Sequence, residues 1–120
     1  MKKISIGLIG LGNIGTGVVK LLQQNEKLIE QKLGAKLVLK KIADINITSP
    51  RGIKVSKSML TTNAREILND PEISIVIELM GGYEPARTFV LEAVKNGKHV
   101  VTANKAMLAT YGNEIFPAAQ

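Results

Sequence analysis

The sequence predicts an α/β fold in which a mostly parallel sheet has helices on both faces. Three observations support this prediction. First, apolar runs of strand length recur along the chain, at residues 3–9, 36–43, 73–79 and 99–102. Second, segments with a helical spacing of apolar residues lie between these runs. Third, the first run leads directly into three closely spaced glycines.

These glycines have the G-x-G-x-x-G spacing of a dinucleotide-binding turn. Gly10 would make the tight turn, Gly12 would let a pyrophosphate approach the backbone, and Gly15 would let the helix pack against the strand. The negative charge of the ligand would face the unpaired N–H groups at the start of that helix. A glycine-rich turn in another kind of α/β protein is the alternative, and the flanking segments decide between the two.

A helix is expected to begin at Asn13, with one apolar stripe formed by Ile14, Val18, Leu21 and Leu22. Asn25 can end this helix and cap a second helical stretch, which Gly34 ends. Residues 36–43 then form the second strand, which completes a βαβ unit. The glycine motif therefore lies where the Rossmann fingerprint requires it, and we expect a doubly wound sheet with strand order 3-2-1-4-5.

Asp44 follows the second strand directly. A carboxylate at this position can accept hydrogen bonds from the adenosine ribose of NAD, and it would repel the 2′-phosphate of NADP. The alternative is an aspartate that only starts a turn. The next loop is basic, and Arg51, Lys54 or Lys57 can reach a 2′-phosphate, so NAD and NADP both stay open at this point.

A short edge strand is expected over residues 59–62. Asn63 and Glu66 have the spacing of a capping box, which predicts a short helix over residues 64–68. Residues 73–79 are then a buried strand that contains a single charge, Glu78.

Met80, Gly81 and Gly82 follow as a second strand-to-helix turn. Two glycines let this loop lie close to a nicotinamide ribose, and a plain tight turn is an equal alternative. Pro85 suits the first position of the next helix, which Asn96 and Gly97 end.

Residues 99–102 form the last expected strand. His99 stands at its amino end, away from the ligand crevice, so we interpret it as structural. Asn104 and Lys105 stand at the carboxyl end, where ligands of open parallel sheets bind. A lysine there can carry a proton or attract an anionic substrate; on spacing alone, a solvent-facing lysine is the better interpretation.

The composition favours a globular cytoplasmic protein without a membrane span, because no apolar run approaches the roughly 18 to 20 residues that a bilayer requires. The chain has no cysteine, so disulfides and cysteine metal sites are excluded, and we expect no metal site. Residues 1–60 hold eleven Lys/Arg against three Asp/Glu. These lysines are scattered and only two Phe and two Tyr are present, so we expect no nucleic-acid partner.

Four blocks of the sequence together resemble the amino-terminal domain of homoserine dehydrogenase, in that family's order and spacing. They read GLIGLGNIGTGVVKLL, ADINITSPRGI, VIELMGGYEPA and HVVTANKAMLA, and VTANKAML is the most specific piece. The resemblance covers nearly all 120 residues. It implies an oxidoreductase that reversibly reduces L-aspartate 4-semialdehyde to L-homoserine with NAD(P)H, in the biosynthesis of threonine, methionine and isoleucine.

The resemblance also implies site residues. The family's nucleotide-binding positions correspond to Gly10, Leu11, Gly12, Asn13, Ile14, Gly15, Met80, Gly81, Thr102 and Ala103. Lys105 corresponds to a family lysine at the meeting point of nicotinamide and substrate, which makes it the candidate catalytic residue as well as a cofactor contact.

Two departures from the family qualify these expectations. Ile45 stands where many members carry a basic residue that helps to hold a 2′-phosphate, which favours NAD over NADP. Family enzymes also continue for several hundred residues, with a substrate domain and a dimer interface. We therefore expect residues 1–120 to be one dinucleotide-binding domain, an excised or natural piece of a homo-oligomeric enzyme. Alone, it would bind dinucleotide weakly and turn over no substrate, because the small-molecule substrate needs the missing domain.

Two other functions are compatible with the sequence. One is a free-standing Rossmann-type module that senses nucleotides or binds a partner. The other is a different amino-acid or semialdehyde dehydrogenase with the same kind of nucleotide domain.

Overall fold

The computed structural model describes residues 2–49 and 51–104, together with residues 109, 112, 113, 115 and 117. The described residues form a five-stranded parallel sheet in the order β3-β2-β1-β4-β5. This is the predicted strand order. The strands are β1 (Lys2–Ile9), β2 (Ala35–Ala43), β3 (Leu60–Thr61), β4 (Ile73–Glu78) and β5 (His99–Thr102).

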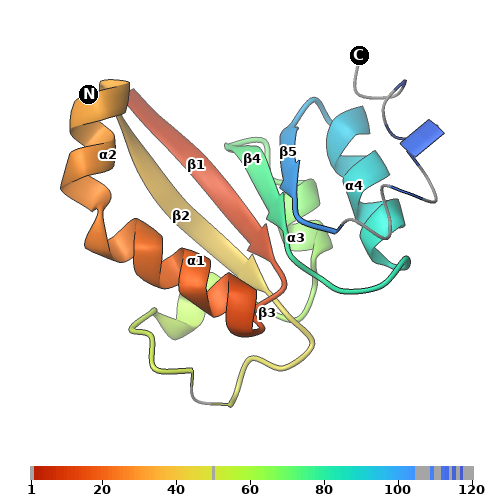
Figure 1. Cartoon of the computed structure of the whole chain (residues 1–120), viewed down its shortest axis with the longest axis horizontal. Helices are drawn as coiled ribbons and strands as arrows, with labels where there is room; N and C mark the ends of the chain where they lie inside the picture. Colours follow the sequence, from red (N-terminus) through yellow and green to blue (C-terminus); the bar gives the residue numbers. More distant parts are fainter. Residues whose placement is uncertain are drawn as a thin grey trace.

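Helices cover both faces of this sheet, as the α/β pattern predicts (Figure 1). They are α1 (Asn13–Gln24), α2 (Glu26–Leu33), α3 (Arg65–Leu68) and α4 (Ala86–Lys95), with a 3₁₀ turn, η1 (Lys57–Met59), before β3. Adjacent residues of a strand point to opposite faces. Accordingly, Leu8 packs in one core cluster with Val19 of α1, whereas Ile9 packs in another with Ile67 of α3 and Ala93 of α4.

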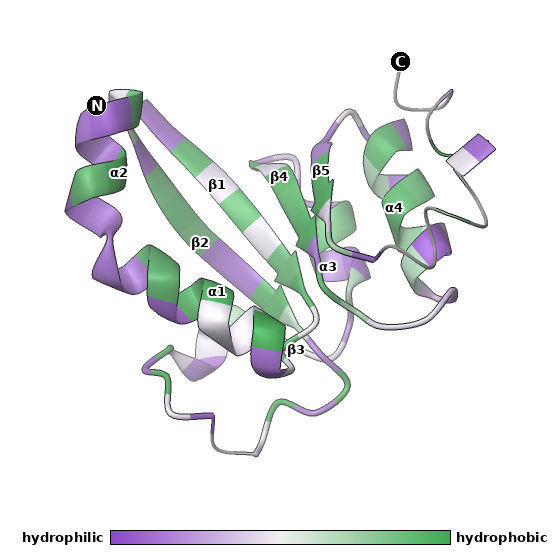
Figure 2. Cartoon of the chain, in the orientation of Figure 1, coloured by the Kyte–Doolittle hydropathy of each residue, from purple (hydrophilic) through white to green (hydrophobic). Residues whose placement is uncertain are grey.

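The core is deepest at the carboxyl ends of the central strands. The last residues of β1 and β2 are fully buried, whereas the first residues of β1 are exposed. Figure 2 shows the same trend, since β1 and β2 are hydrophobic at their arrowheads. The packed interior therefore supports the edge of the sheet from which the glycine loop leaves.

Predicted helix boundaries are confirmed at Asn25 and Gly34. The backbone N–H of Asn25 donates to Leu21 O (3.1 Å), and α2 starts immediately afterwards. The predicted side-chain cap of α2 is wrong, because Nδ2 of Asn25 donates back to Leu21 O (2.9 Å) instead. Gly34 adopts a left-handed conformation with φ +68° and donates its N–H to Glu30 O (2.9 Å). This backbone conformation favours glycine because it has no Cβ.

The predicted apolar stripe of α1 is only partly correct. Val18 and Leu22 are half-buried, as expected, but Ile14 is 66% exposed and Leu21 is 59% exposed, whereas Val19 is completely buried. The buried face of α1 begins at Gly15, which has no side chain and so does not count in a hydrophobic pattern. The sequence pattern therefore omits the first buried residue of the helix, and the predicted buried face is shifted relative to the observed one.

Two other predictions near helix starts need correction. Asn63 accepts a hydrogen bond from Arg65 N–H (3.0 Å), but the carboxylate of Glu66 accepts from the Thr61 hydroxyl instead of completing the capping box. Pro85 immediately precedes α4 rather than occupying its first position. The helix expected after Asn104 falls mostly on residues that the structure does not describe.

Candidate dinucleotide-binding site

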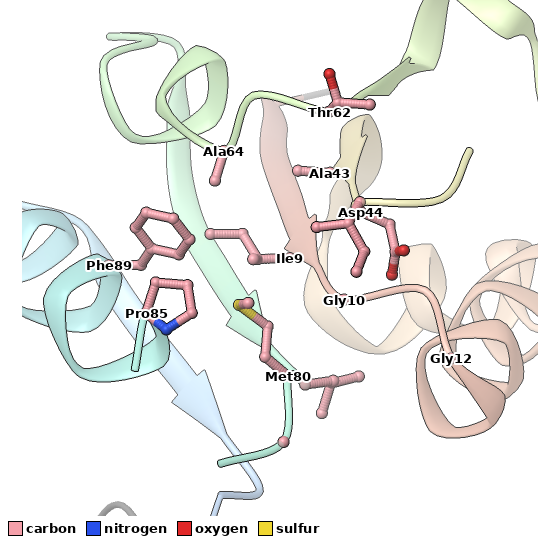
Figure 3. A pocket seen from close by; sticks show the side chains of 13 residues that line it. Ile9, Gly10, Gly12, Ala43, Asp44, Thr62, Ala64, Met80, Pro85 and Phe89 are labelled. Carbon is pink, nitrogen blue, oxygen red and sulfur yellow. The ribbon is translucent and has the colours of Figure 1, made fainter. Parts of the chain in front are cut away.

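A cleft of about 380 Å³ opens at the carboxyl edge of the sheet. The glycine loop after β1, the end of β2, the loop after β4 and the start of α4 form its walls. Figure 3 shows the apolar side chains of Ile9, Met80 and Phe89 turned toward one another, with Asp44 on the side of the glycine loop. Ligands of doubly wound sheets bind at this edge, where the strand order reverses.

Gly10 and Gly15 close the glycine loop through contacts that exclude any side chain. Gly10 has φ +103°, and an added Cβ would lie 2.8 Å from the carbonyl carbon of Leu79. An added Cβ at Gly15 would overlap the carbonyl oxygen of Gly10. The tight turn and the close helix packing predicted from the spacing are therefore confirmed.

Gly12 differs from both, because an added Cβ there would meet nothing within 4 Å. It lies at the mouth of the cleft and immediately precedes α1. The helix begins without a side-chain cap and without an acidic residue in its first turn. The open space beside Gly12 at this helix start suits an anionic ligand group, which the first backbone N–H groups and the positive dipole end of the helix would attract.

Asp44 holds the glycine loop from the end of β2. Its Oδ2 accepts a hydrogen bond from Leu11 N–H (2.6 Å), and its Oδ1 accepts from Asn46 N–H (2.8 Å). The second bond starts a turn, but the first shows that Asp44 does not only start a turn. Asp44 also lines the cleft. The carboxylate is therefore compatible with a second role toward a ribose, which stays a prediction.

Arg51 was not predicted to be structural, yet its side chain is only 16% exposed. Its Nε donates to Leu11 O (2.6 Å), Nη1 donates to Ser49 O (3.0 Å), and Nη2 donates to Asn46 O. Nη2 also lies 3.7 Å from Asp44 Oδ1. Asp44 and Arg51 together fix both the N–H and the C=O of Leu11.

A second unpredicted network links the ends of β4 and β5. Glu78 is completely buried and accepts hydrogen bonds from Met80 N–H (2.8 Å) and from the Thr102 hydroxyl (2.5 Å). Asn104 donates from Nδ2 to Met80 O (3.3 Å) and to Gly82 O (2.5 Å). Only an isolated charge in an apolar strand hinted at this network in the sequence.

The remaining predicted site residues differ in how they can contact a ligand. The Leu11 side chain is 1% exposed and belongs to the core, so only its backbone is near the cleft. Ile14 and Ala103 are exposed, and Thr102 is half-buried. Met80 and Gly81 line the cleft, as predicted. Lys105, the candidate catalytic residue, lies outside the described residues.

The start of α4 completes the cleft with Pro85 and Phe89. The carboxylate of Glu84 accepts hydrogen bonds from the Thr88 hydroxyl (2.8 Å) and from Thr88 N–H (2.9 Å). These two bonds, together with the neighbouring Arg87 guanidinium, lower the pKa of Glu84 below its ordinary value of 4.5. Within the described ranges no group of three or more metal-ligating side chains occurs, and no helix is long and apolar enough to cross a membrane.

The sequence profile of the family described as "Homoserine dehydrogenase, NAD binding domain" matches residues 10–120. The chain belongs to this family. The homoserine dehydrogenase of Synechocystis is 43% identical over 116 residues, which is 97% of this chain and 26% of that protein. The homoserine dehydrogenase of Bacillus subtilis is 37% identical over all 120 residues, or 28% of its length.

Solved structures of the family agree with the fold. The crystal structure of Staphylococcus aureus homoserine dehydrogenase at pH 8.5 superimposes with a TM-score of 0.92 and 40% identity, over 99% of this chain and 30% of that one. The chain thus spans about 26–30% of the length of these relatives. It is a nicotinamide-dinucleotide-binding domain of the homoserine dehydrogenase family, so a glycine turn in an unrelated α/β protein is excluded.

Proposed function

We propose that this chain is the cofactor-binding part of a longer, homo-oligomeric cytoplasmic enzyme that reversibly reduces L-aspartate 4-semialdehyde to L-homoserine. Residues 1–120 would form one domain of that enzyme, and the small-molecule substrate would be held mainly by the rest of it. Family membership supports this assignment. The structural observation that carries its cofactor-binding part is the open space beside Gly12, at an uncapped helix start, where Gly12 lines the cleft; the substrate is inferred from the family.

The residues around the cleft fit a dinucleotide. The pyrophosphate would lie against Gly12 and the first N–H groups of α1, from Asn13 to Gly15, because no side chain blocks that approach. Asp44 would bind the adenosine ribose, and the loop at Met80 and Gly81 would border the nicotinamide half. When bound, the dinucleotide supplies hydride exchange between its nicotinamide C4 and the aldehyde carbon of the substrate.

We infer that NAD is preferred over NADP. The carboxylate of Asp44 lines the cleft, and Ile45 beside it is 92% exposed and offers no charge to a 2′-phosphate. Arg51 is the loop cation nearest to Asp44 in the structure, but its donors already bind backbone carbonyl oxygens. A 2′-phosphate would therefore lie closer to the negative charge of Asp44 than to a cation whose donors are free, and this arrangement would disfavour NADP.

Lys105 would support the chemistry from this side of the active site by moving or stabilising the proton on the substrate oxygen. In the full-length enzyme, Lys105→Ala should lower kcat by about 10²-fold or more, the usual contribution of a proton-transfer group. Dinucleotide affinity should fall much less. Unchanged turnover would remove this role from Lys105.

Calorimetric titration of the chain with NADH, NADPH and ATP tests the assignment. NADH should bind, NADPH should bind more weakly, and the chain alone should turn over no substrate. Gly12→Ala should weaken NADH binding by about tenfold or more, because the added methyl group would fill the space through which the pyrophosphate approaches the backbone. Gly17→Ala is the matched control, since an added Cβ at Gly17 also meets nothing within 4 Å but lies along α1 rather than in the cleft wall.

Failure of both dinucleotides to bind would refute the assignment. Preference for ATP would favour a free-standing nucleotide-sensing module. Equal weakening by Gly12→Ala and Gly17→Ala would show that the pyrophosphate does not approach the glycine loop at Gly12.

A further inference from the structure

Glu78 is a buried charge that does not line the cleft. Its two carboxylate oxygens each accept one hydrogen bond, from Met80 N–H and from the Thr102 hydroxyl. Thr102 Oγ1 itself accepts from Asn104 N–H (3.0 Å), which leaves the hydroxyl proton for Glu78. Two accepted bonds on two oxygens fit the acceptor-only form of a carboxylate. Burial of such a group is costly, and an apolar residue would serve packing better.

The network that contains Glu78 forms a closed ring. It runs from Glu78 to the backbone of Met80, from Met80 O to the amide of Asn104, and from Asn104 N–H through Thr102 back to Glu78. Asn104 is 8% exposed and also binds Gly82 O. The ring therefore fixes the N–H and the C=O of Met80 and one carbonyl of the same loop.

The loop that this ring orients is part of the cleft wall. Met80 and Gly81 both line the cleft, and an added Cβ at Gly81 would meet nothing within 4 Å. Space for a ligand thus lies beside peptide groups whose direction Glu78 and Asn104 determine. Peptide groups that are already aimed bind a ligand with a smaller loss of conformational entropy.

We propose that Glu78 is a positioning residue for the nicotinamide half of the dinucleotide. It acts through the Met80–Gly82 loop and through Thr102, and it makes no contact with the ligand itself. This inference rests on the proposed function, in which the loop borders the nicotinamide half. The adenosine half would lie against the glycine loop and Asp44, whose described hydrogen bonds involve no member of the ring, although the backbone of Met80 packs against Gly10.

The opposite edge of the sheet provides a matched control. Lys98 is 9% exposed, and its Nζ donates to Asp70 O and Ile73 O, each at 2.6 Å. It ties the amino end of β4 to the segment before β5, as Glu78 ties their carboxyl ends. Lys98 also carries a buried charge with two hydrogen bonds, but it does not line the cleft or its loops.

The experiment compares the affinities of Glu78→Gln for NADH and for ADP by calorimetry. ADP carries the adenosine and the diphosphate but lacks the nicotinamide half. Glutamine keeps the shape of Glu78 but removes its charge, and its amide nitrogen must face either Met80 N–H, where two donors would meet, or the Thr102 hydroxyl, which must then accept instead of donate. The ring therefore loses its charge-assisted hydrogen bonds. We expect NADH to bind about tenfold more weakly, while ADP affinity stays within about twofold of wild type.

Three further variants make the result specific. Thr102→Val should weaken NADH binding in the same way, because it removes the hydroxyl that donates to Glu78. Thr102→Ser should restore the wild-type affinity, because it keeps that hydroxyl. Lys98→Met should lower the melting temperature without changing either affinity, since its bonds lie at the far edge of the sheet.

The outcomes separate this inference from the proposed function. The inference is supported if Glu78→Gln and Thr102→Val lose affinity for NADH but not for ADP. If they lose affinity for NADH and ADP equally, or for neither, the inference is overturned and the proposed function still stands. If Glu78→Gln does not fold, the Thr102 pair decides by the same criteria. If the wild-type chain binds neither ligand, both the proposed function and this inference fail.

Discussion

Gly15→Ala probes the contact between the first turn of α1 and the turn that follows β1, where an added Cβ would come closer to a neighbour than at any other described glycine. An added Cβ would overlap the carbonyl oxygen of Gly10 and lie 3.1 Å from its carbonyl carbon. These atoms belong to the backbone and cannot rotate away. Gly10 cannot retreat either, because its own Cα already faces the backbone of Leu79 and Met80. The start of α1 must therefore move.

The expected cost follows from two opposing effects. Forcing one methyl group into such a contact costs about 1–3 kcal/mol, and the backbone neighbours favour the upper part of this range. In the opposite direction, alanine stabilises the folded state by roughly 0.5–1 kcal/mol relative to glycine, because it restricts the unfolded chain and favours the helix. The net loss is about 1–2 kcal/mol, or roughly 3–8 °C in melting temperature for a domain of this size. Gly17→Ala, two residues later, meets no neighbour and should raise the melting temperature by about 2–4 °C.

Thermal unfolding followed by circular dichroism measures both variants under the same conditions. The opposite signs are the decisive feature, because both substitutions add one methyl group to the same helix. If Gly15→Ala were as stable as Gly17→Ala, the helix would not pack on the glycine turn as described. The interpretation of the third glycine of the motif would then be wrong.

Two further predictions concern charged side chains. Arg51→Met should cost about 1–3 kcal/mol of stability and weaken NADH binding, because Leu11 O loses its donor. Lys54→Met removes the same charge from the same loop and should change neither the stability nor the NADH affinity. If the two variants lost the same stability and affinity, the role of Arg51 would be refuted. The ammonium of Lys40, 2.7 Å away, is the main cause that lowers the pKa of Asp70 below its ordinary value of 3.8. The contribution of Asp70 to the stability of the folded state is thus present above pH 3.8. It is lost as the pH falls through the lower pKa that Asp70 has in the folded state. Asp70→Asn should lower the melting temperature at pH 7, and its difference from wild type should shrink in more acidic solution; a difference independent of pH would exclude the ion pair as its cause.

Local signals explain why so much of the fold follows from the sequence. The turn at Gly10, the helix end at Gly34 and the break at Asn25 each depend on a residue type that is strongly preferred in tight turns or at helix ends. Strand order follows because a crossover between parallel strands has one handedness and the glycine motif fixes the first unit. These features need no knowledge of distant contacts.

The side chains that hold the cleft in shape could not be predicted, because their partners lie far away in the sequence. Arg51 binds the carbonyl of Leu11, forty positions earlier, and Glu78 binds the hydroxyl of Thr102, twenty-four positions later. Neither contact leaves a periodic pattern. The exposed face of α1 was misassigned for a different reason, since Gly15 fills a contact position by having no side chain.

The two walls of the cleft are organised by the same arrangement. On one wall, the N–H of Leu11 donates to Asp44 and its C=O accepts from Arg51. On the other wall, the N–H of Met80 donates to Glu78 and its C=O accepts from Asn104.

In each case a carboxylate at the end of a parallel strand holds one residue of a loop at the carboxyl edge of the sheet. Glu78 holds the loop that follows its own strand β4, whereas Asp44, after β2, holds the loop that follows the neighbouring strand β1. Both loops are therefore fixed by groups that fold with the sheet rather than by the ligand. Such preorganisation reduces the entropy lost on binding. Among the described residues the two arrangements share no hydrogen bond, and they meet where Gly10 packs against the backbone of Leu79 and Met80. We therefore expect a substitution in one arrangement to change mainly its own half of the site, and the comparison of NADH with ADP affinity measures this separation.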